Sequence, residues 1–215
     1  MARKPKNKLG RGGYPQRRVE QRDPRPRFLI VCEGSKTEPS YFRQFPVAKE
    51  LVDLEVIGYG QQPLNVVQYA IDRMEADGSH NSYDQIWAVF DRDDVPKQDF
   101  NEARELAKRK KIGVAYSNEA FELWYLLHFD YLDTALSRTQ YEDMLSKRLR
   151  REDPACLKYE KNDPRTYERL LNRQEKAIEN ATRLLAQYDP PRPYDDNPST
   201  TVHLLVQELK EYSRK

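Results

Sequence analysis

The sequence has little of what would place it in several large protein classes. It contains only two cysteines among its 215 residues, Cys32 and Cys156, which are too few and too far apart for a disulfide scaffold or a zinc knuckle. No stretch approaches the ~18 consecutive apolar residues of a membrane span, and no N-terminal apolar run marks a secretion signal. We therefore expect a cytoplasmic protein that does not act in a membrane.

Charge is abundant but unevenly distributed along the chain. Charged residues make up 33% and hydrophobic residues 38%, and 14 Tyr and 7 Phe argue against general disorder. Residues 1–27 hold ten Lys or Arg against two Asp or Glu, whereas the rest of the chain is mildly acidic. We expect residues 1–26 to be a disordered basic tail, which either adds salt-sensitive affinity for phosphate backbones or is a solvated leader without a role.

Apolar runs alternate with amphipathic segments in the first part of the chain. Strands are expected at residues 28–32, 51–57, 86–90 and 112–116. Helices between and after them predict a parallel sheet flanked by helices, an α/β fold. After residue 130 the sequence predicts only helices, at residues 138–150, 164–188 and 198–212. We therefore expect an α/β domain at 27–135 and a helical C-terminal extension at 136–215 packed on it.

Capping residues place two helices that matter for function. Thr37 is expected to cap the helix after the first strand, with Pro39 in its first turn. Ser117 and Asn118 are expected to cap a helix that continues through Phe129. This second helix is apolar almost all round, so we expect it to be buried.

Acidic residues follow two of the expected buried strands. Glu33 comes directly after the first strand, and Asp91 and Asp93 follow the third. Because the sites of open α/β sheets lie at the carboxyl ends of the strands, we expect these carboxylates to converge. Like charges ~4 Å apart repel by ~4 kcal/mol at an effective dielectric of ~20, so a compensating cation is expected. Oxygen ligands without a thiol cluster indicate Mg²⁺ or Mn²⁺, which suit phosphoryl chemistry. The alternative is a turn followed by a helix cap.

The sequence leaves two interpretations open for each of the other candidate residues. Glu122 lies inside an apolar run, so it is either a salt-bridge partner or a further acidic member of the site. His128, in the same run, is either a core histidine or a general acid or base. Lys36 either meets a phosphate or is a solvated loop charge. Three basic residues interleaved with tyrosines suit either nucleic acid or an ordinary charged surface, namely Lys158, Lys161 and Arg165.

Three motifs resemble those of the RloB-like family, the abortive infection proteins of the AbiLii type. They are VCEGSKTEPSYF at residues 31–42, WAVFDRDD at 87–94 and SNEAFELWYLLHF at 117–129. Weaker similarity occurs at residues 159–162 and 197–202, and the resemblance covers about residues 27–210. One motif departs from the family, because many members carry Pro-Cys or a similar pair where this chain has Asn118-Glu119-Ala120.

The resemblance implies a Toprim-like domain, as in topoisomerases, primases and overcoming-lysogenization-defect nucleases. Such domains carry a metal-binding Glu after the first strand and an Asp-x-Asp after a later one, here Glu33, Asp91 and Asp93. The family also implies prokaryotic anti-phage defence, often beside an ABC-type ATPase partner.

The function we expect is a Mg²⁺-dependent nuclease of abortive infection defence, acting with an ABC-type ATPase. The predicted catalytic residues are Glu33, Asp91, Asp93, Glu122, His128 and Lys161. The predicted nucleic-acid contacts are Lys36, Lys158, Lys161 and Arg165. The alternative is a non-catalytic regulatory subunit that binds nucleic acid or a nucleotide. The choice between DNA and RNA, and homo-oligomer formation, stay open.

Overall fold

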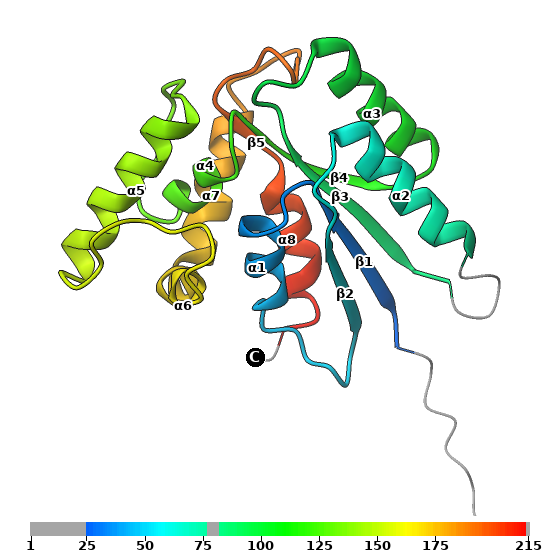
Figure 1. Cartoon of the computed structure of the whole chain (residues 1–215), viewed down its shortest axis with the longest axis horizontal. Helices are drawn as coiled ribbons and strands as arrows, with labels where there is room; N and C mark the ends of the chain where they lie inside the picture. Colours follow the sequence, from blue (N-terminus) through cyan, green and yellow to red (C-terminus); the bar gives the residue numbers. More distant parts are fainter. Residues whose placement is uncertain (1–24, 77–81, 214–215) are drawn as a thin grey trace, which may run out of the picture.

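The computed structural model describes residues 25–76 and 82–213, which form an α/β fold (Figure 1). The sheet has the order β2-β1-β3-β4-β5, in which the first four strands are parallel and β5 is antiparallel to β4. The strands are β1 (Arg27–Cys32), β2 (Asp53–Gly58), β3 (Gln85–Asp91), β4 (Gly113–Asn118) and β5 (Ser199–Thr200). The predicted parallel sheet flanked by helices is confirmed. The predicted basic tail lies outside the described residues, except for its last two positions.

Helices cover both faces of the sheet. One face carries α2 (Pro63–Ala76) and α3 (Lys97–Arg109), and the other carries α1 (Thr37–Arg43) and α8 (Val202–Lys210) (Figure 1). Because successive strand residues point to opposite faces, β1 is buried on both sides. Leu29 and Val31 pack in the core under α2 and α3, whereas Phe28 and Ile30 pack in the core on the α1 side.

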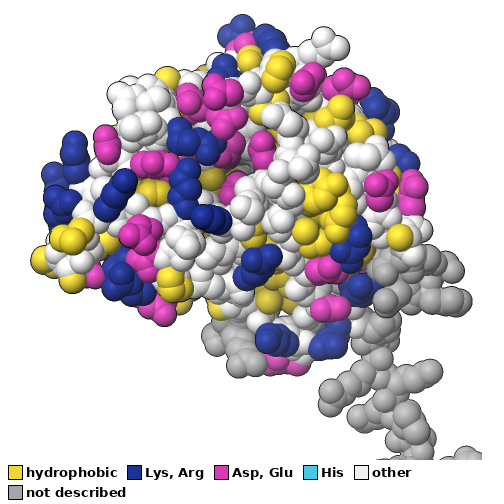
Figure 2. Space-filling view, in the orientation of Figure 1, with side chains coloured by type: hydrophobic (Ala, Val, Ile, Leu, Met, Phe, Trp, Pro, Cys, Tyr) yellow, Lys and Arg dark blue, Asp and Glu magenta, His cyan; other side chains and the backbone are white. Residues whose placement is uncertain are grey.

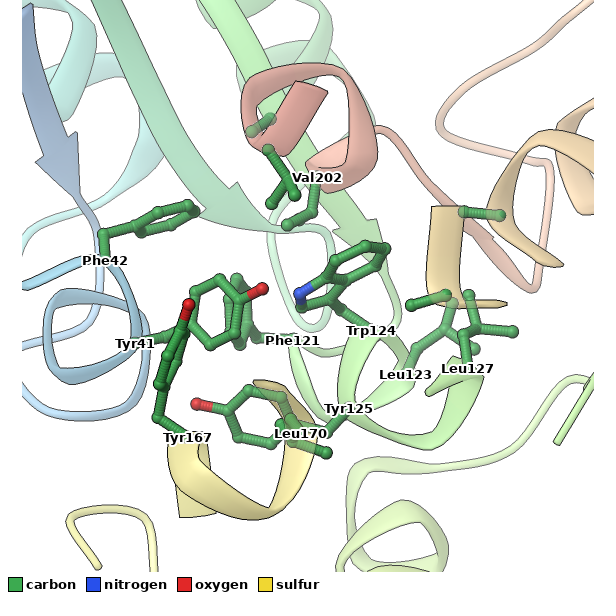
Figure 3. Close-up of a cluster of buried hydrophobic side chains, with 14 of the residues drawn as sticks. Tyr41, Phe42, Phe121, Leu123, Trp124, Tyr125, Leu127, Tyr167, Leu170 and Val202 are labelled. Atoms are coloured by element: carbon green, nitrogen blue, oxygen red, sulfur yellow. The ribbon is translucent and has the colours of Figure 1, made fainter. Parts of the chain in front are cut away.

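The remaining helices extend the core on the α1 side. They are α4 (Glu122–Leu127), α5 (Arg138–Glu152), α6 (Arg165–Leu170), the 3-10 turn η1 (Leu171–Arg173) and α7 (Gln174–Leu185). Figure 3 shows Tyr167 of α6 beside Tyr41 of α1, with ring centroids 5.2 Å apart, in the cluster that also holds Leu170 of α6 and Trp124 of α4. The C-terminal helices and the α1 face of the sheet therefore share one hydrophobic cluster.

The structure corrects several predicted boundaries. Thr37 is the first residue of α1 rather than its cap, which is Lys36. Ser117 and Asn118 do not cap a helix but end β4, because they pair with β5; the next helix is α4, shorter than predicted. The helix predicted at 164–188 is interrupted by η1, whereas the helix predicted at 198–212 begins only at Val202, because residues 199 and 200 form β5.

Candidate functional site

Five carboxylates gather at the carboxyl edge of the sheet, a group that we call the acidic corner: Glu33, Glu38, Asp91, Asp93 and Glu122. The ends of β1 and β3 are neighbours there, because the Glu33 backbone N–H donates to the Val89 carbonyl at 2.8 Å. The Asp91 backbone N–H donates to Glu33 Oε2 at 2.9 Å. The predicted convergence of Glu33 with Asp91 is therefore present in the structure.

A cavity of about 180 Å³ opens at the acidic corner, between the β1–α1 turn and the helices α4 and α5. Its lining includes Glu38, Asp91 and Glu122, whose residues are 6%, 6% and 2% exposed. Three segments far apart in the sequence thus present carboxylates to one small, polar space. A ligand of this cavity would contact several of them at once.

Glu38 was not predicted from the sequence, although it belongs to this group. Its side chain folds back over the β1–α1 turn, so that a Cβ atom on Gly34 would lie 2.2 Å from Glu38 Oε2. Only glycine leaves room for this approach. The available signal was its spacing, five residues after Glu33 and in the first turn of α1.

Glu122, on α4, lies on another side of the cavity, where a hydrogen bond holds its carboxylate. Tyr159, in the loop between α5 and α6, donates its hydroxyl to Glu122 Oε1 at 3.1 Å. Of the two interpretations of Glu122, its place among the carboxylates favours membership of the site.

Arg138 is the basic partner inside the acidic corner, and it was also missed. It is the first residue of α5, whose start is fixed by a capping box between Ser137 and Gln140. Its Nη2 donates to Asp91 Oδ2 at 3.0 Å and to Asp93 Oδ2 at 2.6 Å. The two aspartates therefore face the same side, and a guanidinium lies between them.

Burial changes the protonation of the acidic corner. Desolvation is the largest cause that raises the pKa of Glu33 to about 7, and the charges of Asp93 and Glu38 raise it further, whereas the Asp91 N–H and Arg138 lower it. Desolvation also raises the pKa of Asp91 and of Glu38, and Arg138 again opposes the shift. Arg138 alone therefore does not offset the desolvation and mutual repulsion of these carboxylates, which a bound proton or a further cation would relieve.

The donor chemistry fits a hard divalent cation such as Mg²⁺, because every acidic group in the corner offers carboxylate oxygens. As the side chains stand, however, no group of three His, Cys, Asp or Glu residues within 25–76 and 82–213 is arranged to hold a metal ion. One oxygen of each carboxylate is already engaged: Oδ2 of Asp91 and Oδ2 of Asp93 accept from Arg138, and Oε2 of Glu33 accepts from a backbone N–H. Arg138 thus takes the position of a cation between the two aspartates.

Basic side chains border the acidic corner (Figure 2). Lys36 and Lys161 line the cavity; Lys36 is exposed, and Lys161 pairs with Glu142 at 2.9 Å. Lys158 and Arg165 are exposed and are not part of its lining, and Arg165 pairs with Asp163 at 3.1 Å. The structure thus brings two of the four predicted nucleic-acid contacts to the site.

His128 lies in the core and not at the cavity. It is fully buried, its Nδ1 is 2.9 Å from the Trp124 carbonyl oxygen, and its ring packs edge-on to the Trp124 and Tyr41 rings. Burial lowers its pKa to about 4, so the ring is neutral at pH 7. This position matches the core histidine of the two interpretations, and its catalytic role stays a prediction.

The comparisons with known proteins agree with the motifs. A family model described as RloB-like protein matches residues 28–209. The chain belongs to the RloB-like family. Neither the curated proteins nor the solved structures gave a match. Within the described part of this RloB-like protein, no helix is long and apolar enough to cross a membrane.

Each of the three motifs at 31–42, 87–94 and 117–129 of this RloB-like protein contributes at least one carboxylate to the acidic corner. The first supplies Glu33 and Glu38, the second supplies Asp91 and Asp93, and the third supplies Glu122. Motifs that are separate in the sequence therefore form one site in the fold.

Proposed function

We propose that this RloB-like protein is a Mg²⁺- or Mn²⁺-dependent nuclease that hydrolyses phosphodiester bonds in prokaryotic anti-phage defence by abortive infection. The main support is the convergence of five carboxylates from three segments at the acidic corner, three of which, Glu38, Asp91 and Glu122, line a cavity of about 180 Å³. The proposal includes a Toprim-like classification of the α/β part and an ABC-type ATPase as partner. Membership of the RloB-like family supports the defence role.

Glu33, Asp91 and Asp93 would hold the ion, with Glu122 as a further ligand. When bound, the ion polarises the phosphate and lowers the pKa of a coordinated water. Glu33, with its pKa near 7, also suits the alternative role of general base. Lys36 and Lys161 would bind phosphate oxygens from the rim of the cavity.

Cleavage assays on DNA and RNA, with Mg²⁺, Mn²⁺ or EDTA and with and without the ATPase, test the proposal. We expect Asp91→Asn to abolish cleavage by the folded protein. Asp94→Asn is the matched control, because Asp94 is exposed and lies three positions along the same segment. A wild-type protein that is inert under every condition, or a fully active Asp91→Asn variant, would contradict the proposal.

A non-catalytic subunit that binds nucleic acid or a nucleotide is the second candidate. Arg138 favours it, because this residue already neutralises part of the charge of Asp91 and Asp93. Binding that is unchanged by EDTA and by Asp91→Asn, without turnover, would select this candidate over the nuclease.

A further inference from the structure

Arg138 occupies one oxygen of each of the two aspartates that would hold a divalent cation. Its two ion pairs reach Asp91 Oδ2 and Asp93 Oδ2, and its charge lowers the pKa of Glu33, Glu38 and Asp91. The same oxygens cannot serve the guanidinium and a metal ion in full at the same time. The two cations therefore compete for one pair of aspartates.

The Arg138 side chain is partly exposed and can turn away from the two aspartates, whereas its backbone is held in place at the start of α5. The capping box holds the start of α5 beside the cavity. The Arg138 side chain is 35% exposed, whereas that of Asp91 is only 8% exposed. If the guanidinium turns away from the aspartates, it therefore stays within reach of a ligand in the cavity. A guanidinium is suited to bind two oxygens of a phosphate at once.

From these contacts we infer that Arg138 is a phosphate-binding residue that is held on Asp91 and Asp93 until a divalent cation replaces it. The cation then takes the aspartates, and the guanidinium turns to the phosphate of the bound nucleic acid. This inference rests on the proposed nuclease function and adds to it the residue that couples metal binding to substrate binding.

Competition between Arg138 and a metal ion predicts a different result from a purely structural role of Arg138. If Arg138 only stabilised the acidic corner, its removal would loosen the metal ligands and weaken metal binding. If Arg138 competes with the metal, its removal strengthens metal binding and weakens cleavage. The two effects of one substitution then have opposite signs.

The test is titration calorimetry with Mn²⁺ on the full chain, for wild type, Arg138→Gln and Arg138→Lys. We expect Arg138→Gln to bind Mn²⁺ about tenfold more tightly, because an opposing charge has left the ligands. At saturating Mn²⁺ we expect it to cleave about 10²-fold more slowly, because a donor to the phosphate is missing. Arg138→Lys keeps the charge but not the fork-shaped donor, so its Mn²⁺ affinity is expected to stay near that of wild type while cleavage falls.

Arg148→Gln is the control, since Arg148 lies on the same helix, pairs with Asp130 at 3.6 Å and has a side chain 31% exposed. Circular dichroism establishes that each variant is folded. If Arg138→Gln does not fold, Arg138→Lys tests the phosphate contact alone, and wild-type cleavage by a folded Arg138→Lys protein would overturn the inference. Equal or weaker Mn²⁺ binding by a folded Arg138→Gln protein would overturn the inference and leave the nuclease proposal standing. Absence of Mn²⁺ binding in both wild type and Arg138→Gln would overturn the metal-dependent function itself.

Discussion

The buried His128 makes the stability of the protein depend on pH in a way that one substitution should reveal. Its folded-state pKa of about 4 lies below the usual 6.5, so below pH 6.5 the unfolded chain binds more protons. Stability from this group is complete above pH 6.5 and is lost as the pH falls toward 4. Between pH 7.5 and 4.5 the loss amounts to about 2.5 kcal/mol.

His128→Leu removes this titration while keeping an apolar side chain of similar size. At pH 7.5 we expect the variant to be less stable by about 1 kcal/mol, because the hydrogen bond to the Trp124 carbonyl is lost. At pH 4.5 we expect it to be more stable than wild type by about 1.5 kcal/mol, because it has no imidazole to protonate. The two curves of stability against pH should therefore cross.

Urea unfolding at a series of pH values, in EDTA, measures the difference between the two proteins. Other titrating groups, including the buried His203 and the acidic corner, are common to both and largely cancel. Tyr167→Phe is the matched control, because its buried hydroxyl has no hydrogen-bond partner among the described residues and it lies in the same core. Curves for wild type and His128→Leu that stay parallel from pH 7.5 to 4.5 would refute the reasoning.

Three further predictions concern the site. In EDTA, Glu33→Gln should raise the free energy of unfolding by ~1–2 kcal/mol at pH 8 but only slightly at pH 5. The reason is that the raised pKa of Glu33 makes its charged carboxylate unfavourable only at high pH. Equal gains at the two pH values in thermal unfolding would contradict this prediction. Gly34→Ala should displace the Glu38 carboxylate and reduce metal-dependent cleavage with the fold kept, so unchanged cleavage would be evidence against a role for Glu38. Lys161→Met should change the free energy of unfolding by less than ~1 kcal/mol, because the ion pair of Lys161 with Glu142 is partly exposed. The same variant should bind nucleic acid more weakly in a fluorescence polarisation assay. Unchanged binding would show that Lys161 is not part of the site.

The sequence predicted the parts of the fold that have a strong local pattern. The β1 and β3 strands are continuous apolar runs, and they lie side by side at the centre of the sheet. The two-residue strand β5 has no such pattern, because its place depends on pairing with Ser117 and Asn118 far earlier in the chain. That missed pairing is also why β4 was predicted too short and the following helix too long.

The residues of the candidate site likewise fall into those that the sequence predicts and those that only the fold reveals. Glu33, Asp91 and Asp93 were predicted because each follows a recognisable buried strand. Glu38 reaches the same place only because its side chain folds back over the turn. Arg138 is one of 37 Lys and Arg residues in the chain, and nothing local distinguishes it from the others. Such residues become visible only when the fold brings distant segments together.

The order in which the ribosome makes this chain bears on when the sheet can be completed. Ser199 and Thr200 form its antiparallel edge, and α8 after them buries Val202, Leu205, Val206 and Leu209 in the core. A nascent chain that has emerged only as far as α5 lacks both. We therefore expect the finished architecture to appear only after α8 has been synthesised, and fragments that stop before β5 to be recovered as aggregated or protease-sensitive material.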